Sequence, residues 1–285
     1  MANLKEIRNR ISSVSSTMQI TSAMKMVSAA KLKKAQDAIT AMRPYADKLT
    51  ELLQNLSATL DADSGSKFAD QREVKNVLFV AITSNRGLCG AFNSNIIKQA
   101  NYLANSYAGK KVSVVAIGKK ANDALSKEYE ILANESTVFD DLTFDNVAQI
   151  AELLMQKFEE GSVDKIELVY NKFKNAATQI VTTEQFLPIV PSADATDANQ
   201  DYIFEPSKAE IVETLIPKSL KTQLFKAIRD SFASEHGARM TAMHKATDNA
   251  TDLRDQLKLT YNKARQAAIT NEILEIVGGA EALNN

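Results

Sequence analysis

The sequence predicts an α/β protein in which long N- and C-terminal helices pair as an antiparallel coiled coil, next to an α/β domain with a largely parallel sheet. Two observations predict this class. Residues 1–43 contain no glycine or proline, and residues 218–285 contain no proline and three glycines. Because glycine and proline interrupt helices, these ends favour long helices. The segment between them alternates strand-like and helix-like patterns, which is typical of α/β domains.

The composition is that of a folded protein with few reactive side chains. Its 285 residues are 45% hydrophobic and 24% charged, with a net charge of −1, so neither disorder nor a global basic field is indicated. One cysteine, Cys89, and two histidines, His236 and His244, exclude an internal disulfide and disfavour a zinc site. Because no run of eighteen apolar residues and no apolar signal core occur, we expect a soluble cytosolic protein.

The N-terminal helix is expected within residues 1–60. Its apolar residues begin at heptad spacing, with alternating steps of three and four, which is the pattern of a coiled-coil seam. The apolar pattern then shifts through Ile20, Met24 and Val27, so the repeat is not sustained as in a fibrous coiled coil. The residues at heptad spacing are Leu4, Ile7, Ile11, Val14 and Met18.

The C-terminal helix is expected within residues 207–285. If continuous, residues 218–277 would form a helix of about 90 Å at 1.5 Å per residue. A compact chain of this size has a radius of gyration near ~19 Å. This length favours two terminal helices that pair with each other and project from the middle domain. It disfavours helices that pack on an ordinary core. The apolar stripe comprises Leu253, Leu257, Tyr261, Ala264 and Ala268, then Ile273, Ile276, Val277, Ala280 and Leu283.

The middle segment, residues 74–192, is expected to form a Rossmann-like α/β domain. Strands are predicted at residues 74–83, 111–118, 166–173 and 178–189, and helices at 92–107 and 146–160. The first strand is almost continuously apolar, as expected for a strand covered on both faces. The polar segment 193–201 is predicted to be a loop.

Charge is distributed unevenly along the chain. Residues 1–43, 44–217 and 218–285 carry net charges of +6, −9 and +2. The basic N-terminal helix has either a solvated face or a face that matches acidic partner surfaces or nucleic acid. Few aromatic residues accompany its basic residues, with only Tyr45 nearby, which disfavours nucleic acid.

The segment SNRGLCGAFN, residues 84–93, follows a strand and precedes a helix, where phosphate-binding loops occur. It lacks both common glycine-rich phosphate motifs, so Gly87 and Gly90 are interpreted as a structural turn. Cys89 has no spaced base that would activate it. His236 and His244 are eight residues apart, not four, and are expected at the surface or at partner contacts. The sequence therefore predicts no catalytic, cofactor-binding or metal-binding residue.

Several blocks in a fixed order carry a resemblance. These are MANLKEIRNRISSVSSTMQITSAMKMVSAAKLKKAQ, RGLCGAFN, SEHGARMTAMHKATDNA and LTYNKARQAAITNEILEIVGGA. The chain resembles the gamma subunit of F-type ATP synthases of the bacterial type. The resemblance implies a central rotor shaft, with no cofactor and no chemistry of its own, turning inside a ring of three alpha and three beta subunits. It also implies contacts with the epsilon subunit and the rotor ring of c subunits. Membrane contact would be only through the complex, at the cytoplasmic face of the bacterial inner membrane.

The resemblance also assigns roles to single residues. Met24 and Lys25 match the helix segment facing acidic partner loops, and Arg265 and Gln266 match the pair that hydrogen-bonds a loop of an open beta subunit. Gly87 and Gly90 match a structural turn. Ile269, Ile273 and Ile276 lie in the tip that turns in the apolar collar of the ring.

The chain departs from the family pattern at three places. Ser22 stands where lysine is common, and Gly237 stands where alanine is usual. With only one cysteine, the dithiol switch of chloroplast relatives cannot operate.

Two other functions stay open on the residues alone. A nucleotide-binding α/β enzyme with a helical extension would bind ATP as an isolated chain, and the missing phosphate loop disfavours it. A basic coiled-coil protein that binds nucleic acid or membrane surfaces would bind in a salt-sensitive way, and the acidic middle segment disfavours it.

Overall fold

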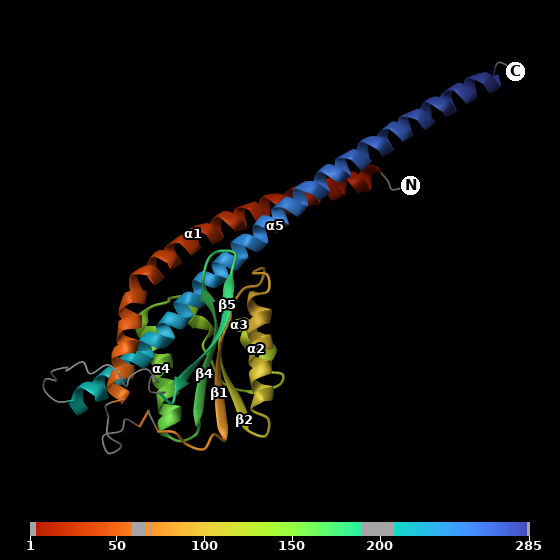
Figure 1. The fold of residues 1–285 in the computed structure, drawn as a ribbon. Coiled ribbons are helices and arrows are strands. Elements are labelled where there is room, and N and C mark those ends of the chain that lie inside the picture. Colours follow the sequence, from red (N-terminus) through yellow and green to blue (C-terminus); the bar gives the residue numbers. More distant parts are fainter. Residues whose placement is uncertain (1–3, 59–66, 69, 190–207, 284–285) are drawn as a thin grey trace. The chain divides into compact units, whose positions relative to one another are not determined.

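The computed structural model describes residues 4–58, 67–68, 70–189 and 208–283. They fall into two compact units. The helical unit comprises Met1–Ser28 and Met240–Asn285, and the sheet unit comprises Ala29–Arg239. Two long helices, α1 (Leu4–Ala58) and α5 (Lys208–Leu283), each contribute residues to both units (Figure 1).

The sheet unit contains a five-stranded sheet of order β3-β2-β1-β4-β5. Strands β1 (Asn76–Ile82), β2 (Lys111–Ile117), β3 (Glu130–Asn134) and β4 (Lys165–Phe173) are parallel, and β5 (Gln179–Leu187) runs antiparallel to β4. The largely parallel sheet is therefore confirmed. The connecting helices are α2 (Phe92–Ser106), α3 (Lys119–Leu125) and α4 (Phe144–Glu159), with a 3-10 turn, η2, at Ser136–Phe139.

Strand β3 and helix α3 were not predicted from the sequence, so the predicted set of four strands is incomplete. Strand β3 is five residues long, lies at the edge of the sheet and buries only alternate side chains partially. Helix α3 has seven residues, which is too short to show a helical period. Neither element carries enough apolar sequence to stand out locally.

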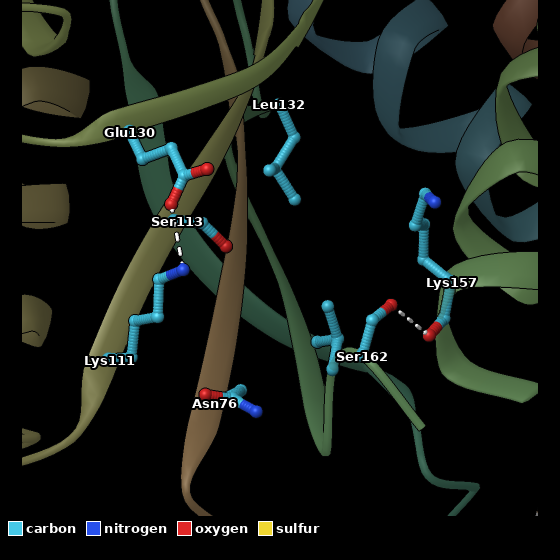
Figure 2. Close-up of a pocket in the computed structure, with 8 residues that line it drawn as sticks. Asn76, Lys111, Ser113, Glu130, Leu132, Lys157 and Ser162 are labelled. Carbon is cyan, nitrogen blue, oxygen red and sulfur yellow. Dashed lines mark hydrogen bonds and ion pairs between the residues drawn. The ribbon is translucent and has the colours of Figure 1, made fainter. Parts of the chain in front are cut away.

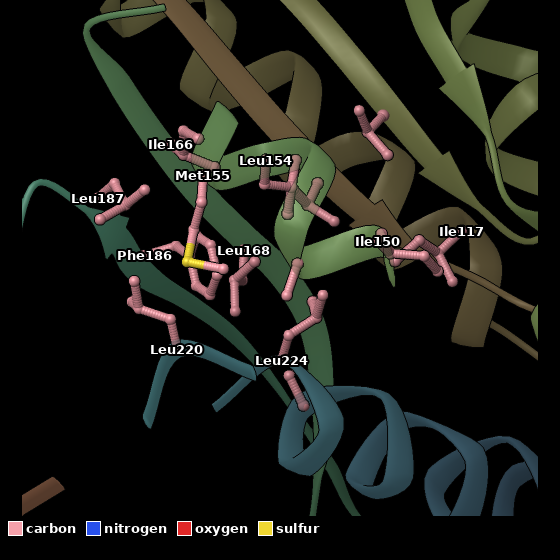
Figure 3. Close-up of a cluster of buried hydrophobic side chains, with 14 of the residues drawn as sticks. Ile117, Ile150, Leu154, Met155, Ile166, Leu168, Phe186, Leu187, Leu220 and Leu224 are labelled. Carbon is pink, nitrogen blue, oxygen red and sulfur yellow. The ribbon is translucent and has the colours of Figure 1, made fainter. Parts of the chain in front are cut away.

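Strand β1 supplies both hydrophobic cores, because its two faces are covered. Leu78, Val80 and Ile82 pack with residues of α4 and α5 on one face. Val77 and Phe79 pack with residues of α2 and α3 on the other. Figure 3 shows the first cluster, in which Leu154 of α4 and Leu224 of α5 lie among strand side chains. The near-continuous apolar run of β1 follows from this double burial.

The long helices continue through the prolines that bound the breaker-poor ends of the sequence. Pro44 lies inside α1 and Pro217 inside α5. Proline removes one backbone hydrogen bond, here to the carbonyl of Thr40. Both Pro44 and Thr40 are exposed, so water can satisfy that carbonyl. A proline on an outer helix face is therefore compatible with a continuous helix.

In the helical unit, α1 and α5 pair in antiparallel register. Arg8 Nη2 donates to the hydroxyl of Tyr261 at 2.8 Å, and Lys25 Nζ lies 3.5 Å from His244 Nδ1. An advance of 17 residues along α1 thus matches a retreat of 17 along α5. Figure 1 shows the red start of α1 alongside the blue part of α5. The predicted antiparallel pair is confirmed.

Polar residues occupy part of the seam between these helices. Buried or half-buried residues of α1 continue at heptad steps from Met18 to Thr21, Lys25 and Ser28. Thr247 Oγ1 donates to Thr21 Oγ1 at 2.8 Å, and Thr251 Oγ1 lies 3.4 Å from the sulfur of Met18. The apolar repeat stops there, but the buried positions continue.

Three residues of the predicted apolar stripes lie outside the seam between α1 and α5. Ile20 and Val27 are 60% and 57% exposed, so the shifted stripe is an outer surface and not a shifted seam. On α5, Leu253 is exposed, whereas the next residue, Arg254, is half-buried and lies 3.6 Å from the sulfur of Met18. The next residues of the α5 stripe agree with the predicted seam, because they are half-buried and one of them bonds α1; they are Leu257, Tyr261 and Ala264.

Candidate partner-binding surfaces

The last part of α5 exposes apolar side chains that no part of α1 covers. The antiparallel register places Leu4, the first described residue of α1, opposite Arg265. All residues of α5 from 265 to 280 are exposed. A lone helix with this composition favours a partner, because exposed apolar patches of this kind mark interaction sites. The large apolar side chains are Ile269, Ile273, Leu274, Ile276 and Val277, and their exposure ranges from 48% to 66%.

Arg265 and Gln266 lie where the pairing with α1 ends. Both side chains are exposed, and the nearest interhelical bond, between Arg8 and Tyr261, is one helical turn away. Neither side chain has a hydrogen bond described to it, whereas Thr270 Oγ1 donates to the backbone carbonyl of Gln266 at 2.9 Å. Their polar groups are therefore presented outward from the helix, as a partner contact requires.

Met24 and Lys25 lie near the end of the part of α1 that belongs to the helical unit, on the flank of the exposed stripe. Ile20, Met24 and Val27 follow steps of four and three, so they share one helix face. Lys25 approaches His244, whose Nδ1 lies 3.3 Å from Asp248 Oδ2. The 21 residues between His244 and Arg265 correspond to roughly 30 Å of helix. The structure therefore separates these two predicted contacts into two surfaces.

A side chain of α5 holds the turn after β1 by donating hydrogen bonds to its backbone carbonyls. Arg239 Nη2 donates to the carbonyls of Arg86 at 3.0 Å and Gly87 at 3.2 Å. Gly90 has a φ of +60°, which favours glycine. A Cβ at Gly87 would meet no atom within 4 Å, so space does not require glycine there. Leu88, with a φ of +61°, is 64% exposed.

Helix α5 covers the point where α/β sheets ordinarily bind ligands. The strand order reverses next to β1, between connections to β2 on one side and β4 on the other, and ligands of such sheets bind outside the strand ends at this reversal. Here Ser234 Oγ donates to the carbonyl of Asn171 at the end of β4, at 2.9 Å. A Cβ at Gly237 would lie 3.2 Å from backbone atoms of Ala176. The chain's own helix occupies this position, and glycine permits the close approach.

Buried charges accompany this coverage. Arg239 Nη1 donates to Glu235 Oε1 at 2.6 Å, and both side chains are about nine-tenths buried. Burial raises the pKa of Glu235, which Arg239 partly counteracts. Burial also lowers the pKa of His236 to about 4, with a further contribution from the charge of Arg239. Glu235 and Arg239 therefore form a buried pair beside a neutral His236.

The expected surface position is wrong for His236, which is 5% exposed and packs edge-on against the ring of Phe232 at a centroid distance of 4.5 Å. His244, in contrast, is exposed. The helical period around His236 contains the polar residues Ser234, Glu235 and Arg239, so the sequence carried no signal of its burial.

Burial raises the pKa of the Cys89 thiol, which lies among Ser84 and Asn93.

A cavity of about 210 Å³ opens near the start of β1 and β2 (Figure 2). It is smaller than ligand pockets, which usually span roughly 300–1,000 Å³. Lys111 pairs with Glu130 at 3.0 Å, and Lys157 pairs with Glu160 at 3.1 Å. With both lysines paired to carboxylates, the lining offers little unneutralised positive charge to an anion.

Across the described ranges, no group of three or more histidine, cysteine, aspartate or glutamate side chains is placed to hold a metal ion. Within the same ranges, no helix has a stretch long and apolar enough to cross a membrane.

Comparison with known proteins identifies the family. The model of the ATP synthase family that matches the chain covers residues 3–283. The ATP synthase gamma chain of Flavobacterium psychrophilum is 78% identical over 284 residues, covering 99% of each chain. That of Flavobacterium johnsoniae is 76% identical over the full length of both.

Solved structures agree with this assignment. The mitochondrial ATP synthase of Tetrahymena thermophila, solved as central stalk and c-ring, contains a chain 26% identical with a TM-score of 0.59, covering 80% of this chain and 99% of that one. A chain of the Euglena gracilis mitochondrial ATP synthase has a TM-score of 0.69 at 24% identity, covering 98% and 94%, and shows the same fold. On the full-length match of model and relatives, the chain belongs to the gamma-chain family of ATP synthases.

Proposed function

We propose that the chain is the central rotor shaft of a proton-translocating F-type ATP synthase. It couples proton flow through the membrane sector to ATP synthesis or hydrolysis at the beta subunits, by rotating inside a ring of three alpha and three beta subunits. It is a subunit of the complex and does no chemistry of its own. The observation that carries this function is the exposed apolar end of α5, which extends past α1 in the helical unit.

The helical unit supplies the contacts with the ring. The apolar residues Ile269, Ile273 and Ile276 suit a surrounding apolar collar, in which a turning helix needs a smooth surface without fixed polar bonds. Arg265 and Gln266 hydrogen-bond a beta-subunit loop, and Met24 and Lys25 face acidic partner loops. The exposure of all seven side chains, full or partial, supports these roles. An asymmetric shaft of this kind acts by shifting its partners between conformations.

The sheet unit supplies the remaining contacts, with the epsilon subunit and the rotor ring of c subunits. The name of the Tetrahymena assembly, central stalk and c-ring, supports this placement. We assign residues 1–60 and 207–285 to the shaft helices and residues 74–192 to the α/β domain. The complex is membrane-associated, and we place this subunit peripherally at the cytoplasmic face of the bacterial inner membrane.

Rotation is the direct test. The alpha–beta ring is fixed to a surface and a bead is attached through Ser106→Cys, an exposed position of α2, while the buried Cys89 remains unlabelled. We expect stepwise rotation that requires ATP. A bead that stays still while the same complexes hydrolyse ATP would contradict the proposal.

Ligand binding separates the proposal from a nucleotide-binding enzyme. The isolated chain should bind ATP no more tightly than about millimolar, since α5 fills the sheet's usual ligand position and no phosphate motif is present. Equilibrium dialysis with ATP measures this, and a micromolar dissociation constant would favour the enzyme. A filter-binding titration with DNA tests the nucleic-acid alternative in the same way.

A further inference from the structure

One side chain of α1 joins three elements of the sheet unit. Arg43 Nη2 donates to Asp230 Oδ1 of α5 at 3.0 Å and to the carbonyl of Phe173, the last residue of β4, at 2.9 Å. Asp230 is fully buried, whereas the Arg43 side chain is 38% exposed. A single guanidinium therefore ties the N-terminal helix both to the C-terminal helix and to the sheet.

The burial of Asp230 makes the loss of this contact costly in free energy. Its Oδ2 has no hydrogen-bond partner among the described residues, so Arg43 supplies the hydrogen bond described to its carboxylate. Burial raises the pKa of Asp230, and the charges of Arg43, Lys226 and Lys172 counteract this. Removing one partner of a buried ion pair is strongly destabilising, because the other charge stays buried and uncompensated. The pair is therefore fixed in place more firmly than an exposed ion pair would be.

Helix α5 has its own hydrogen bonds to β4 and to the neighbouring strand β5. Gln223 Nε2 donates to Glu184 Oε1 at 2.7 Å and to the carbonyl of Gln185 at 3.2 Å, both on β5. Further along α5, Ser234 donates to the carbonyl of Asn171 on β4. These bonds lie on either side of Asp230 along the helix. Arg43 thus connects α1 at the centre of the segment where α5 is fastened to the sheet.

We propose that the Arg43–Asp230 pair is the mechanical joint through which torque carried by α1 passes to α5 and to the end of β4. This inference rests on the proposed rotor function. The guanidinium suits the task because its planar array of donors resists reorientation, unlike the flexible ammonium of lysine. When torque acts on α1, the joint keeps it from sliding past the sheet. Its importance therefore grows with the load on the rotor.

The test uses the complete ATP synthase in sealed vesicles. Arg43→Gln removes the joint, and Arg43→Gln with Asp230→Asn removes it without leaving a buried charge. Arg43→Lys keeps the charge but replaces the planar guanidinium with a flexible ammonium. Lys221→Gln is the matched control, because it breaks an ion pair between α5 and Glu152 of α4 and leaves α1 untouched. Two quantities are measured: ATP hydrolysis with the proton gradient dissipated, and the largest proton gradient that ATP hydrolysis sustains.

We expect the Arg43→Gln complexes, single and double, to hydrolyse ATP within about twofold of wild type without load, and to sustain a gradient about threefold smaller, because a buried pair is lost. Arg43→Lys should fall between, and Lys221→Gln should match wild type. If the double variant sustains the wild-type gradient, the joint is not at Arg43. Equal loss of hydrolysis and gradient at every load would show a merely structural role and would also overturn the proposal. If wild-type complexes themselves build no gradient, the rotor function fails instead.

Discussion

The sheet unit and the helical unit are built on different physical grounds. In the sheet unit, β1 is covered on both faces, and residues such as Phe79 and Ile82 have no exposed surface. In the helical unit, the seam contains a threonine pair, Thr21 and Thr247, and α5 continues with exposed isoleucines. The sheet unit therefore holds its shape through its own core. The helical unit instead leaves apolar side chains exposed, which partners would cover under the proposed function. Substitutions in the sheet unit should therefore change the stability of the isolated chain, and those in the exposed part of α5 should change the assembled complex.

The largest expected difference concerns one buried and one exposed apolar side chain. Phe158 of α4 is fully buried, and the guanidinium of Arg72 lies over its ring at 5.0 Å. Phe158→Ala should lower the free energy of unfolding by about 3–5 kcal/mol, because it leaves a cavity. Ile273→Ala should change it by less than about 0.5 kcal/mol, as for exposed sites. Denaturant unfolding of the isolated chain measures both.

The comparison between units would break if Ile273→Ala destabilised the isolated chain as much as Phe158→Ala. In the assembled complex, Ile273→Ala should instead reduce coupling, because the exposed side chain then has a partner.

A pH titration tests the buried histidine of the sheet unit. The pKa of His236 falls to about 4 in the fold from an ordinary value near 6.5. Its neutral form is therefore favoured in the folded state, so its contribution is complete above pH 6.5 and is lost as pH falls from 6.5 towards 4. The loss is up to about 3 kcal/mol. Over this range, His236→Gln should show a smaller decrease in the free energy of unfolding than wild type.

Parallel curves for wild type and His236→Gln would show that His236 is not buried in its neutral form. Glu235, whose pKa is raised, binds protons more strongly in the folded state, so its effect on the pH dependence is opposite to that of His236. Comparing Glu235→Gln with the double variant Glu235→Gln, His236→Gln therefore isolates the contribution of His236.

Two glycines in the sheet unit should differ in how much an alanine substitution destabilises the chain, because only one of them has room for a side chain. Gly118 has a φ of +108°, and a Cβ there would lie 2.2 Å from the backbone oxygen of Thr83. Gly118→Ala should therefore lower the free energy of unfolding by about 1–3 kcal/mol, the usual range for strained backbone. Gly87→Ala meets no atom within 4 Å and should cost little. Thermal unfolding separates them, and equal melting temperatures would show that the turn after β2 relaxes.

The smallest expected effect is a functional one in the helical unit. Replacing Arg265 and Gln266 together with alanine should leave the isolated chain's stability unchanged, since both are exposed, but slow ATP turnover several-fold in the complex. Charge-assisted bonds in an interface are worth about 1.5–3 kcal/mol. The control replaces Lys31, Lys33 and Lys34 with glutamine, which should mainly change the salt dependence. Unchanged turnover in assembled Arg265/Gln266 complexes would make that contact dispensable.

The long helices, the buried parallel strands and the family could all be predicted from the residues along the chain. Each of these depends on local spacing or on blocks of identity along the chain. The run at β1 is apolar because both its faces are covered, and the heptad from Leu4 to Met18 is apolar because it faces α5. Such patterns are visible without knowing which partner a residue meets.

Which face of a helix is buried depends on long-range packing and could not be predicted at every position. The tertiary structure placed Ile20 and Val27 outside and Thr21 inside, buried His236, and added the short edge strand β3. It also paired Arg43 with Asp230, which lie 187 residues apart. A polar residue in a helix is buried only when another element supplies its bonds, and that element is chosen by long-range packing. Local periodicity therefore fixes where helices form, while burial of their polar residues depends on contacts that the spacing does not encode.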